Sequence, residues 1–240
     1  MGLCFLPATT RVSPQVLKFL LVAPILLFSM VAHEVAHGYA AFRQGDDTAH
    51  VLGRLSWNPL RHIDPFMTVL LPLMLFLVNA PFIFGGAKPV PVDPSKYRSL
   101  KRGDIIVSMA GIATNLLIAA LFVPAIIALG LLGRALPAIN DTIALVQVMF
   151  LLGVTINLAL ATFNLIPIPP LDGSHVMKYL LPLSWAVQYQ RVARFGFLLL
   201  VALLSFGRPL LMLWFAPMLR VNAFAADAVY PFLLSSPWTT

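Results

Sequence analysis

Charged residues are scarce in this chain. They make up 10% of its 240 residues, whereas apolar residues make up 60% and the mean hydropathy is +0.89. This balance excludes an ordinary water-soluble domain and predicts a membrane protein. The net charge of +7 would suit nucleic acid, but the 16 Lys and Arg residues are spread through short loops between apolar runs. We therefore expect a lipid bilayer and no nucleic acid as a partner, with the basic loops setting the orientation in the membrane.

Cysteine and glutamate each occur once. Cys4 lies near the N-terminus, so the chain can form no internal disulfide and has no cysteine pattern for a metal site. Glu34 is the one glutamate among nine acidic residues. Any site that needs two glutamates is therefore excluded.

Long apolar runs dominate the sequence. They cover about Val16–Phe42, Phe66–Phe84, Ile105–Leu132, Ile143–Phe163 and Phe195–Phe215. At roughly 20 residues per crossing, they predict an all-α polytopic membrane protein with about four to six membrane segments and short extended segments in the loops. We expect a single domain over residues 1–240, with its core at about 18–180 and an accessory membrane segment at 195–240. The first run is too long for a cleaved signal peptide, so we expect a retained helix.

Basic loops orient these runs. The linker 85–103 is rich in Lys and Arg and the loop after the third run is not, so the third run goes from inside to outside. The linker 43–65 also carries arginines, so a spanning Phe66–Phe84 run would put two basic linkers on opposite sides. Two prolines and an asparagine inside this run favour a re-entrant hairpin. Its length would also suit a plain spanning helix.

The pentapeptide His33-Glu34-Val35-Ala36-His37 carries the chemistry. Residues four apart share one face of a helix, so His33 and His37 can bind one metal ion while Glu34 reaches a water on that metal. Zinc lowers the pKa of such a water to about 7, and a carboxylate beside it can take the proton and later deliver it to a leaving amine. This pattern is the metalloprotease signature. A chance match is the alternative, but these side chains are costly inside a bilayer without a function.

A third metal ligand must come from elsewhere. The single glutamate excludes zinc sites completed by a downstream Glu, and the extended pattern with a third histidine fails because Ala40 and Arg43 occupy its positions. The remaining candidates are the aspartates and three histidines, His50, His62 and His175. Of these, His50 and His62 are expected to be solvated. His175 is close enough in the sequence to contact Asp172 without binding the metal itself. Asp104 is expected at a helix start, where its charge suits the helix dipole.

Asp172 differs from the other aspartates. It follows Asn164–Leu171, where three prolines break a membrane helix and free backbone polar groups at membrane depth. The two motif histidines lie about 10 Å before the inner end of the first helix, and Asp172 lies a comparable step before Lys178. Both segments would then lie at the same depth below the inner membrane surface, provided that the second apolar run enters and leaves the membrane on the same side. An ordinary turn at Asp172 is the alternative.

These motifs make the chain resemble the site-2 protease family of intramembrane zinc metalloproteases, in particular the compact bacterial members without PDZ or CBS domains. The resemblance covers about residues 18–180. It rests on His33–Gly38, Ala110–Asn115 and Asn164–Gly173, with flanking matches at Gly53–Leu55, Asn58–Leu60, His62–Pro65 and Ala87–Val92.

The resemblance implies one Zn²⁺ per chain held by His33, His37 and Asp172, with Glu34 as general base and acid. It also implies that Asn164 assists at the scissile carbonyl, although this amide could equally cap the broken helix. We expect Asn115 to make a helix-packing hydrogen bond rather than to act in catalysis. At Ile112 the family usually has proline, and we expect this departure to alter a helix start rather than the chemistry.

The implied activity is hydrolysis of peptide bonds in or near the transmembrane segments of membrane-protein substrates. The implied location is the bacterial inner membrane, with the active site toward the cytoplasmic side. The Ala87–Val92 stretch, whose prolines exclude a helix, is expected to be an irregular loop or an edge strand that holds an unwound substrate. The alternative class is a metal-binding or metal-transporting membrane protein, since His and Asp inside helices also mark ion pathways. The sequence names neither the substrate nor the oligomeric state.

Overall fold

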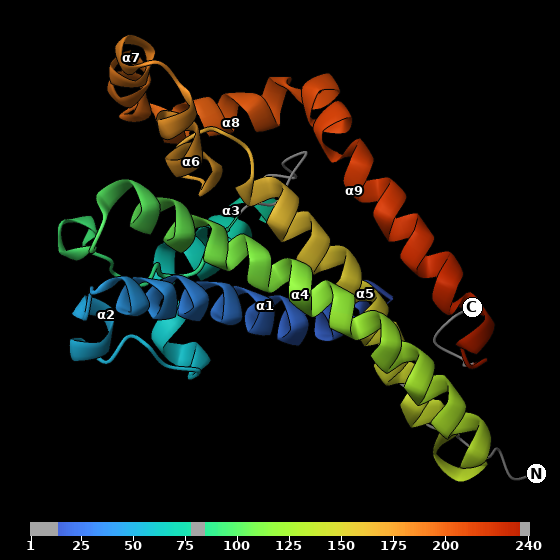
Figure 1. Ribbon diagram of the computed structural model, residues 1–240. Helices are drawn as coiled ribbons and strands as arrows, with labels where there is room; N and C mark the ends of the chain where they lie inside the picture. Colours follow the sequence, from blue (N-terminus) through green and yellow to red (C-terminus); the bar gives the residue numbers. More distant parts are fainter. Residues whose placement is uncertain (1–13, 78–84, 236–240) are drawn as a thin grey trace, which may run out of the picture.

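The computed structural model describes residues 14–77 and 85–235, and within them the secondary structure is helical without any strand. Three long helices form the core and lie side by side in Figure 1, namely α1 (Pro14–Gln44), α4 (Leu100–Ala135) and α5 (Asn140–Asn164). A fourth long helix, α9 (Arg208–Val229), packs on α5. The described part of the chain thus has four helices long and apolar enough to cross a membrane, which confirms an all-α polytopic protein.

Shorter elements connect these helices. They are α2 (Thr48–Val51), α3 (Leu71–Leu77), α6 (Gly173–Leu180), α7 (Leu183–Ala193), α8 (Gly196–Phe206), a π-helix at Pro65–Leu70 and 3₁₀ turns at Pro59–His62, Pro94–Lys96, Pro137–Ile139 and Tyr230–Phe232. The α7 and α8 helices meet at a bend of 81°, so they form at most one bent crossing. The apolar run Phe195–Phe215 is divided between α8 and α9 at Gly207. Pro209 explains the break, because proline fits the first turn of a new helix and not the interior of a continuing one.

The start of the second apolar run lies against the residues that directly follow the run. Gly86 N donates to Met67 O at 3.1 Å, and Thr68 Oγ1 donates to Gly86 O at 2.6 Å. The two ends of the run are therefore in contact, as expected of a re-entrant hairpin and not of a helix that crosses the bilayer. Its predicted turn, within residues 78–84, lies outside the described residues. The chain then continues through Ala87–Val92, which has no regular secondary structure and belongs to no sheet in the described structure.

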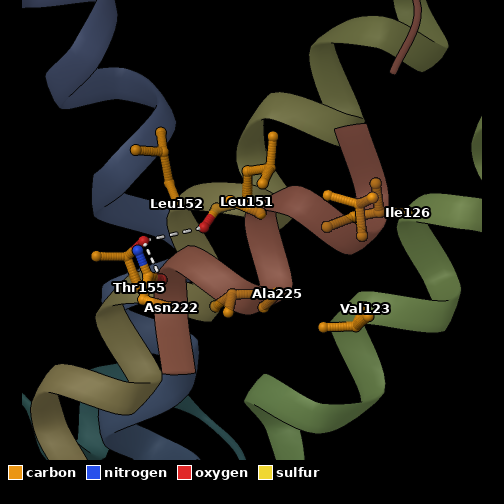
Figure 2. Close-up of a pocket in the computed structure, with 10 residues that line it drawn as sticks. Val123, Ile126, Leu151, Leu152, Thr155, Asn222 and Ala225 are labelled. Atoms are coloured by element: carbon orange, nitrogen blue, oxygen red, sulfur yellow. Dashed lines mark hydrogen bonds between the residues drawn. The ribbon is translucent and has the colours of Figure 1, made fainter. Parts of the chain in front are cut away.

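Side-chain hydrogen bonds connect α9 to α5 at two points along the helices. Trp214 Nε1 donates to Thr162 O at 2.9 Å, and Thr155 Oγ1 donates to Asn222 Oδ1 at 2.9 Å. Figure 2 shows the second pair beside an apolar pocket of about 180 Å³ between α4, α5 and α9. Beyond the end of α9, buried Gln147 donates to Phe232 O and accepts from Leu234 N, both at 3.0 Å. The pocket is lined by none of the predicted metal ligands, so it is not the reaction site.

Candidate metal centre

Two histidines of α1 point the same way. His33 and His37 are one helical turn apart, their rings meet edge to face with centroids 4.5 Å apart, and their Nε2 atoms are 2.9 Å apart. This is the shared face that the four-residue spacing predicts. Such close nitrogens need either a proton or a cation between them.

The opposite ring nitrogens bind the neighbouring helix α4. His33 Nδ1 donates to Asn115 Oδ1 at 3.0 Å, and His37 Nδ1 donates to Val107 O at 2.7 Å. With both protons on Nδ1, each Nε2 presents its lone pair to the same point. Hydrogen bonds of this kind fix the tautomer and the ring orientation of metal-binding histidines.

Asp172 brings a third potential ligand atom to the two histidines. Its Oδ2 lies 3.1 Å from His33 Nε2 and 3.4 Å from His37 Nε2, and it is buried without a hydrogen-bond partner. Zinc bonds of about 2.0–2.1 Å in a tetrahedron place neighbouring ligand atoms roughly 3.3 Å apart. The three atoms therefore fit one face of a zinc site, and among the described residues this is the one group of three or more potential ligands.

A glycine of α4 makes room for this arrangement. A Cβ atom on Gly111 would lie 2.5 Å from both His33 Cε1 and His37 Nε2. Gly111 and Asn115 are four residues apart, so one face of α4 both admits the two rings and orients one of them. The Ala110–Asn115 motif is therefore part of the metal centre.

The segment that brings Asp172 to the histidines is a run of turns anchored by apolar packing. Main-chain hydrogen bonds link Ile166 N to Phe163 O and Leu171 N to Ile168 O. The side chains of Ile166 and Leu171 are buried together with Leu200 of α8. The prolines that end α5 thus lead into a folded connection that can hold a ligand in place.

The α6 helix, which begins directly after Asp172, is held by Asp104 of α4. The buried Asp104 carboxylate accepts from His175 Nδ1 at 3.2 Å and from the Tyr179 hydroxyl at 3.1 Å, and it pairs with Lys178. Asp104 lies near the start of α4, as expected, and it also binds side chains of α6, which was not expected. Its partners come from a segment about 70 residues away, which periodicity within one helix does not reveal.

Glu34 faces a different neighbour. Its Oε2 accepts a hydrogen bond from Val90 N at 2.8 Å. Within the described residues Oε1 has no protein partner. One carboxylate oxygen is thus held and the other remains available to a substrate or a water.

The other predicted residues do not belong to this group of potential ligands. Asn164 donates its amide to Leu160 O in its own helix at 3.1 Å. His50 is exposed, as expected, and its ring packs on Phe42. His62 was expected to be solvated, but it is buried and hydrogen-bonds to Ser56 O at 2.7 Å. His175 bonds to Asp104 rather than to the carboxylate of Asp172.

Two expectations about α4 can now be judged. Asn115 does join two helices, as expected, but the partner that it binds is a candidate metal ligand, His33. Ile112 is buried in the middle of α4, so the expectation of an altered helix start there is wrong. The helix already begins at Leu100, and isoleucine continues it without the break that proline would introduce.

The fold and the site together define an integral membrane protein in which two histidines and an aspartate could hold a metal ion beside a glutamate. The profile of the family described as Peptidase family M50 matches residues 21–206. The chain therefore belongs to this family of site-2 proteases, and it is a zinc-dependent intramembrane endopeptidase.

Curated relatives agree with this assignment. The chain is 35% identical over 210 residues to "Putative zinc metalloprotease YwhC" of Bacillus subtilis (strain 168), covering 87% of this chain and 89% of the relative. It is 31% identical over 213 residues to "Putative zinc metalloprotease Rip2" of Mycolicibacterium smegmatis, covering 86% and 74%. No solved structure matches the chain. The alternative of a metal transporter is not favoured by these relatives.

Proposed function

We propose that His33, His37 and Asp172 hold one Zn²⁺ and that Glu34 is the general base and acid of the protease. The observation that carries this proposal is the convergence of two Nε2 atoms and one buried carboxylate oxygen within 3.4 Å of one another. Glu34 adjoins these ligands in the sequence and on the helix.

The residues divide the chemistry between them. Bound to the three ligands, zinc would supply a Lewis acid that activates water and polarises the scissile carbonyl. Glu34 takes the proton of the attacking water on its free oxygen and delivers it to the nitrogen of the leaving amine. Asn115 and the Val107 carbonyl keep the two imidazole rings in the tautomer that can bind metal.

Asn164 is proposed to assist at the scissile carbonyl. It is the last residue of α5, at the start of the segment that leads to Asp172. The role requires its amide to exchange the bond to Leu160 O for one to the substrate oxygen. Asn164→Ala should then lower kcat by about 10²- to 10³-fold without loss of zinc, whereas a cap alone would change only the melting temperature.

The enzyme acts on membrane substrates, and we propose that these are transmembrane segments cleaved near the cytoplasmic face of a bacterial inner membrane. The basic linkers before α4 and around α2 support this orientation. Because a helix hides its own peptide bonds, the substrate must unwind locally before cleavage. We further propose that residues 1–240 act as one domain, in which the segment after 195 is accessory to the core at 18–180.

Replacing Glu34 with Gln tests the assignment. The purified variant is reconstituted into liposomes and compared with the wild type for bound zinc and for cleavage of single-pass substrates. Asp141→Asn, an exposed acid in the first turn of α5, is the matched control. We expect Glu34→Gln to keep its zinc and to lose about 10²- to 10⁴-fold in cleavage rate. Unchanged cleavage would refute the role of Glu34.

A further inference from the structure

The backbone of Lys88–Pro91, which we call the strap, presents a single donor to α1. Pro89 and Pro91 have no N–H group, so Val90 carries the one amide proton between Lys88 and Val92. This proton is donated to Glu34 Oε2 at 2.8 Å. The two prolines thus leave Val90 as the one main-chain donor between Lys88 and Val92, and this donor is bound to the carboxylate proposed as general base.

The strap is held on both sides of Val90. Lys88 N donates to His62 O at 2.7 Å, and Arg54 Nη2 donates to Lys88 O at 3.1 Å and to Pro89 O at 3.3 Å. After the strap, Asp93 N donates to Asp46 Oδ2 at 2.6 Å. The Val90 amide is therefore fixed relative to the core by hydrogen bonds that come before and after it in the chain.

The α1 helix is shaped to receive the strap. The Val90 side chain is buried, and a Cβ atom on Gly38 would lie 2.8 Å from its Cγ1. Gly38 is one turn beyond Glu34 on the same face of the helix. The side chain of Val90 thus rests on Gly38 while its amide reaches the carboxylate.

We infer that the Val90 main-chain amide is a positioning group for Glu34, and that Arg54 keeps this amide in place by binding the two preceding carbonyls. The inference rests on the proposed role of Glu34. A charge-assisted hydrogen bond restricts the carboxylate to one orientation, and a misplacement of about 1 Å can cost roughly 100-fold in rate. The Val90 N–H is then not free to pair with a substrate strand, as the edge-strand expectation for Ala87–Val92 would require.

Proline substitution removes the amide proton and tests the inference. Val90→Pro should lower kcat by about 10- to 100-fold, with KM changed by less than about threefold and zinc content unchanged. Val92→Pro is the matched control, since Val92 is exposed and its N–H makes no hydrogen bond within the described residues. Val90→Ala keeps the amide and trims the side chain, so it should retain most of kcat.

An ester bond at position 90 gives the same test without adding a proline ring or changing the valine side chain. The α-hydroxy acid analogue of valine, introduced by cell-free synthesis, replaces the N–H with oxygen and should lower kcat as Val90→Pro does. If both the ester and the proline variant turn over substrate at the wild-type rate with normal zinc content, the inference is overturned.

Thermal unfolding separates positioning from general support of the fold. With Glu34 present, Val90→Pro should lower the melting temperature more than Val92→Pro does. This excess should become smaller when Glu34 is replaced with Ala, because the hydrogen bond between the two groups is then already absent. An equal excess in both backgrounds would contradict the inference. Cleavage by Glu34→Gln at the wild-type rate would instead refute the proposed function itself, so the two failures can be told apart.

Discussion

His33 Nδ1 donates to Asn115 Oδ1 across 3.0 Å, and this bond links α1 to α4 at the metal centre. Asn115 is fully buried, and its Nδ2 atom has no hydrogen-bond partner in the described structure. Position 115 therefore has a buried amide side chain of which only the oxygen makes a hydrogen bond. A ligand-orienting role explains why the cost of burying the amide is tolerated.

Removing this acceptor should weaken zinc binding. We expect Asn115→Leu to lower zinc affinity by about 10- to 100-fold, because the His33 ring is no longer held in its metal-binding tautomer. Asn115→Asp keeps an acceptor and should retain zinc better than Asn115→Leu. Competition with a chelator of known zinc affinity measures both. Equal affinities for the wild type and Asn115→Leu would contradict the role given to Asn115.

Filling the space beside Gly111 should also weaken zinc binding. Gly111→Ala places a methyl group 2.5 Å from atoms of both His33 and His37, so one ring or the α4 backbone must shift. We expect zinc content and cleavage to fall together. Ala113→Leu, at an exposed position on the same helix, is the control and should change neither. Normal zinc binding by Gly111→Ala would show that the rings have more room than the structure indicates.

The residues that could be predicted from the sequence are those whose chemistry is local. His33, Glu34 and His37 belong to about one helical turn, and the depth of the two segments in the membrane pointed to Asp172. Asp104, Gly111 and the Val90 amide could not be recognised in this way. Each acts on a residue at least 50 positions away, through packing that helix periodicity does not specify, and in Val90 the acting group belongs to the backbone.

The features of the fold likewise divide into those that the sequence predicts and those that it does not. The long helices α1, α4 and α5 were predicted from hydropathy, because each must be apolar over the thickness of the bilayer. The break at Gly207 was not predicted, since the apolar run continues through it. The buried state of His62 was not predicted either, because it depends on the fold of the surrounding linker.

Asp104 should control the position of Asp172 through α6. We expect Asp104→Ala to lower the melting temperature and the zinc affinity, because Lys178, His175 and Tyr179 lose their shared partner near the ligand. Zinc titration and thermal unfolding in detergent measure the two effects, with exposed Asp141→Asn as control. A loss of stability with wild-type zinc affinity would mean that α6 does not position the ligand.

Asp46 should make stability depend on pH. Burial raises the pKa of Asp46, but hydrogen bonds from Thr48 and from the Asp93 amide, with Lys96 nearby, outweigh burial and bring the pKa below its ordinary value of 3.8. The stabilisation is therefore complete well above pH 3.8 and is lost as the pH falls through the lower, folded-state pKa. We expect Asp46→Asn to lower the melting temperature by roughly 3–12 °C at pH 7, from about 1.5–3 kcal/mol.

The difference in melting temperature between the wild type and Asp46→Asn should shrink as the pH is lowered past 3.8. A constant difference from pH 7 to pH 3 would mean that the charge of Asp46 is not the source of the effect.

The most direct measurement is the zinc content per chain when each candidate third ligand is replaced in turn. The wild type should bind one zinc, Asp172→Ala should lose it, and His50→Ala, His62→Ala and His175→Ala should keep it, because Asp172 Oδ2 alone among these candidates lies within 3.4 Å of both histidine Nε2 atoms. Stoichiometric zinc in Asp172→Ala, together with its loss in one of the histidine variants, would contradict the metal centre described above.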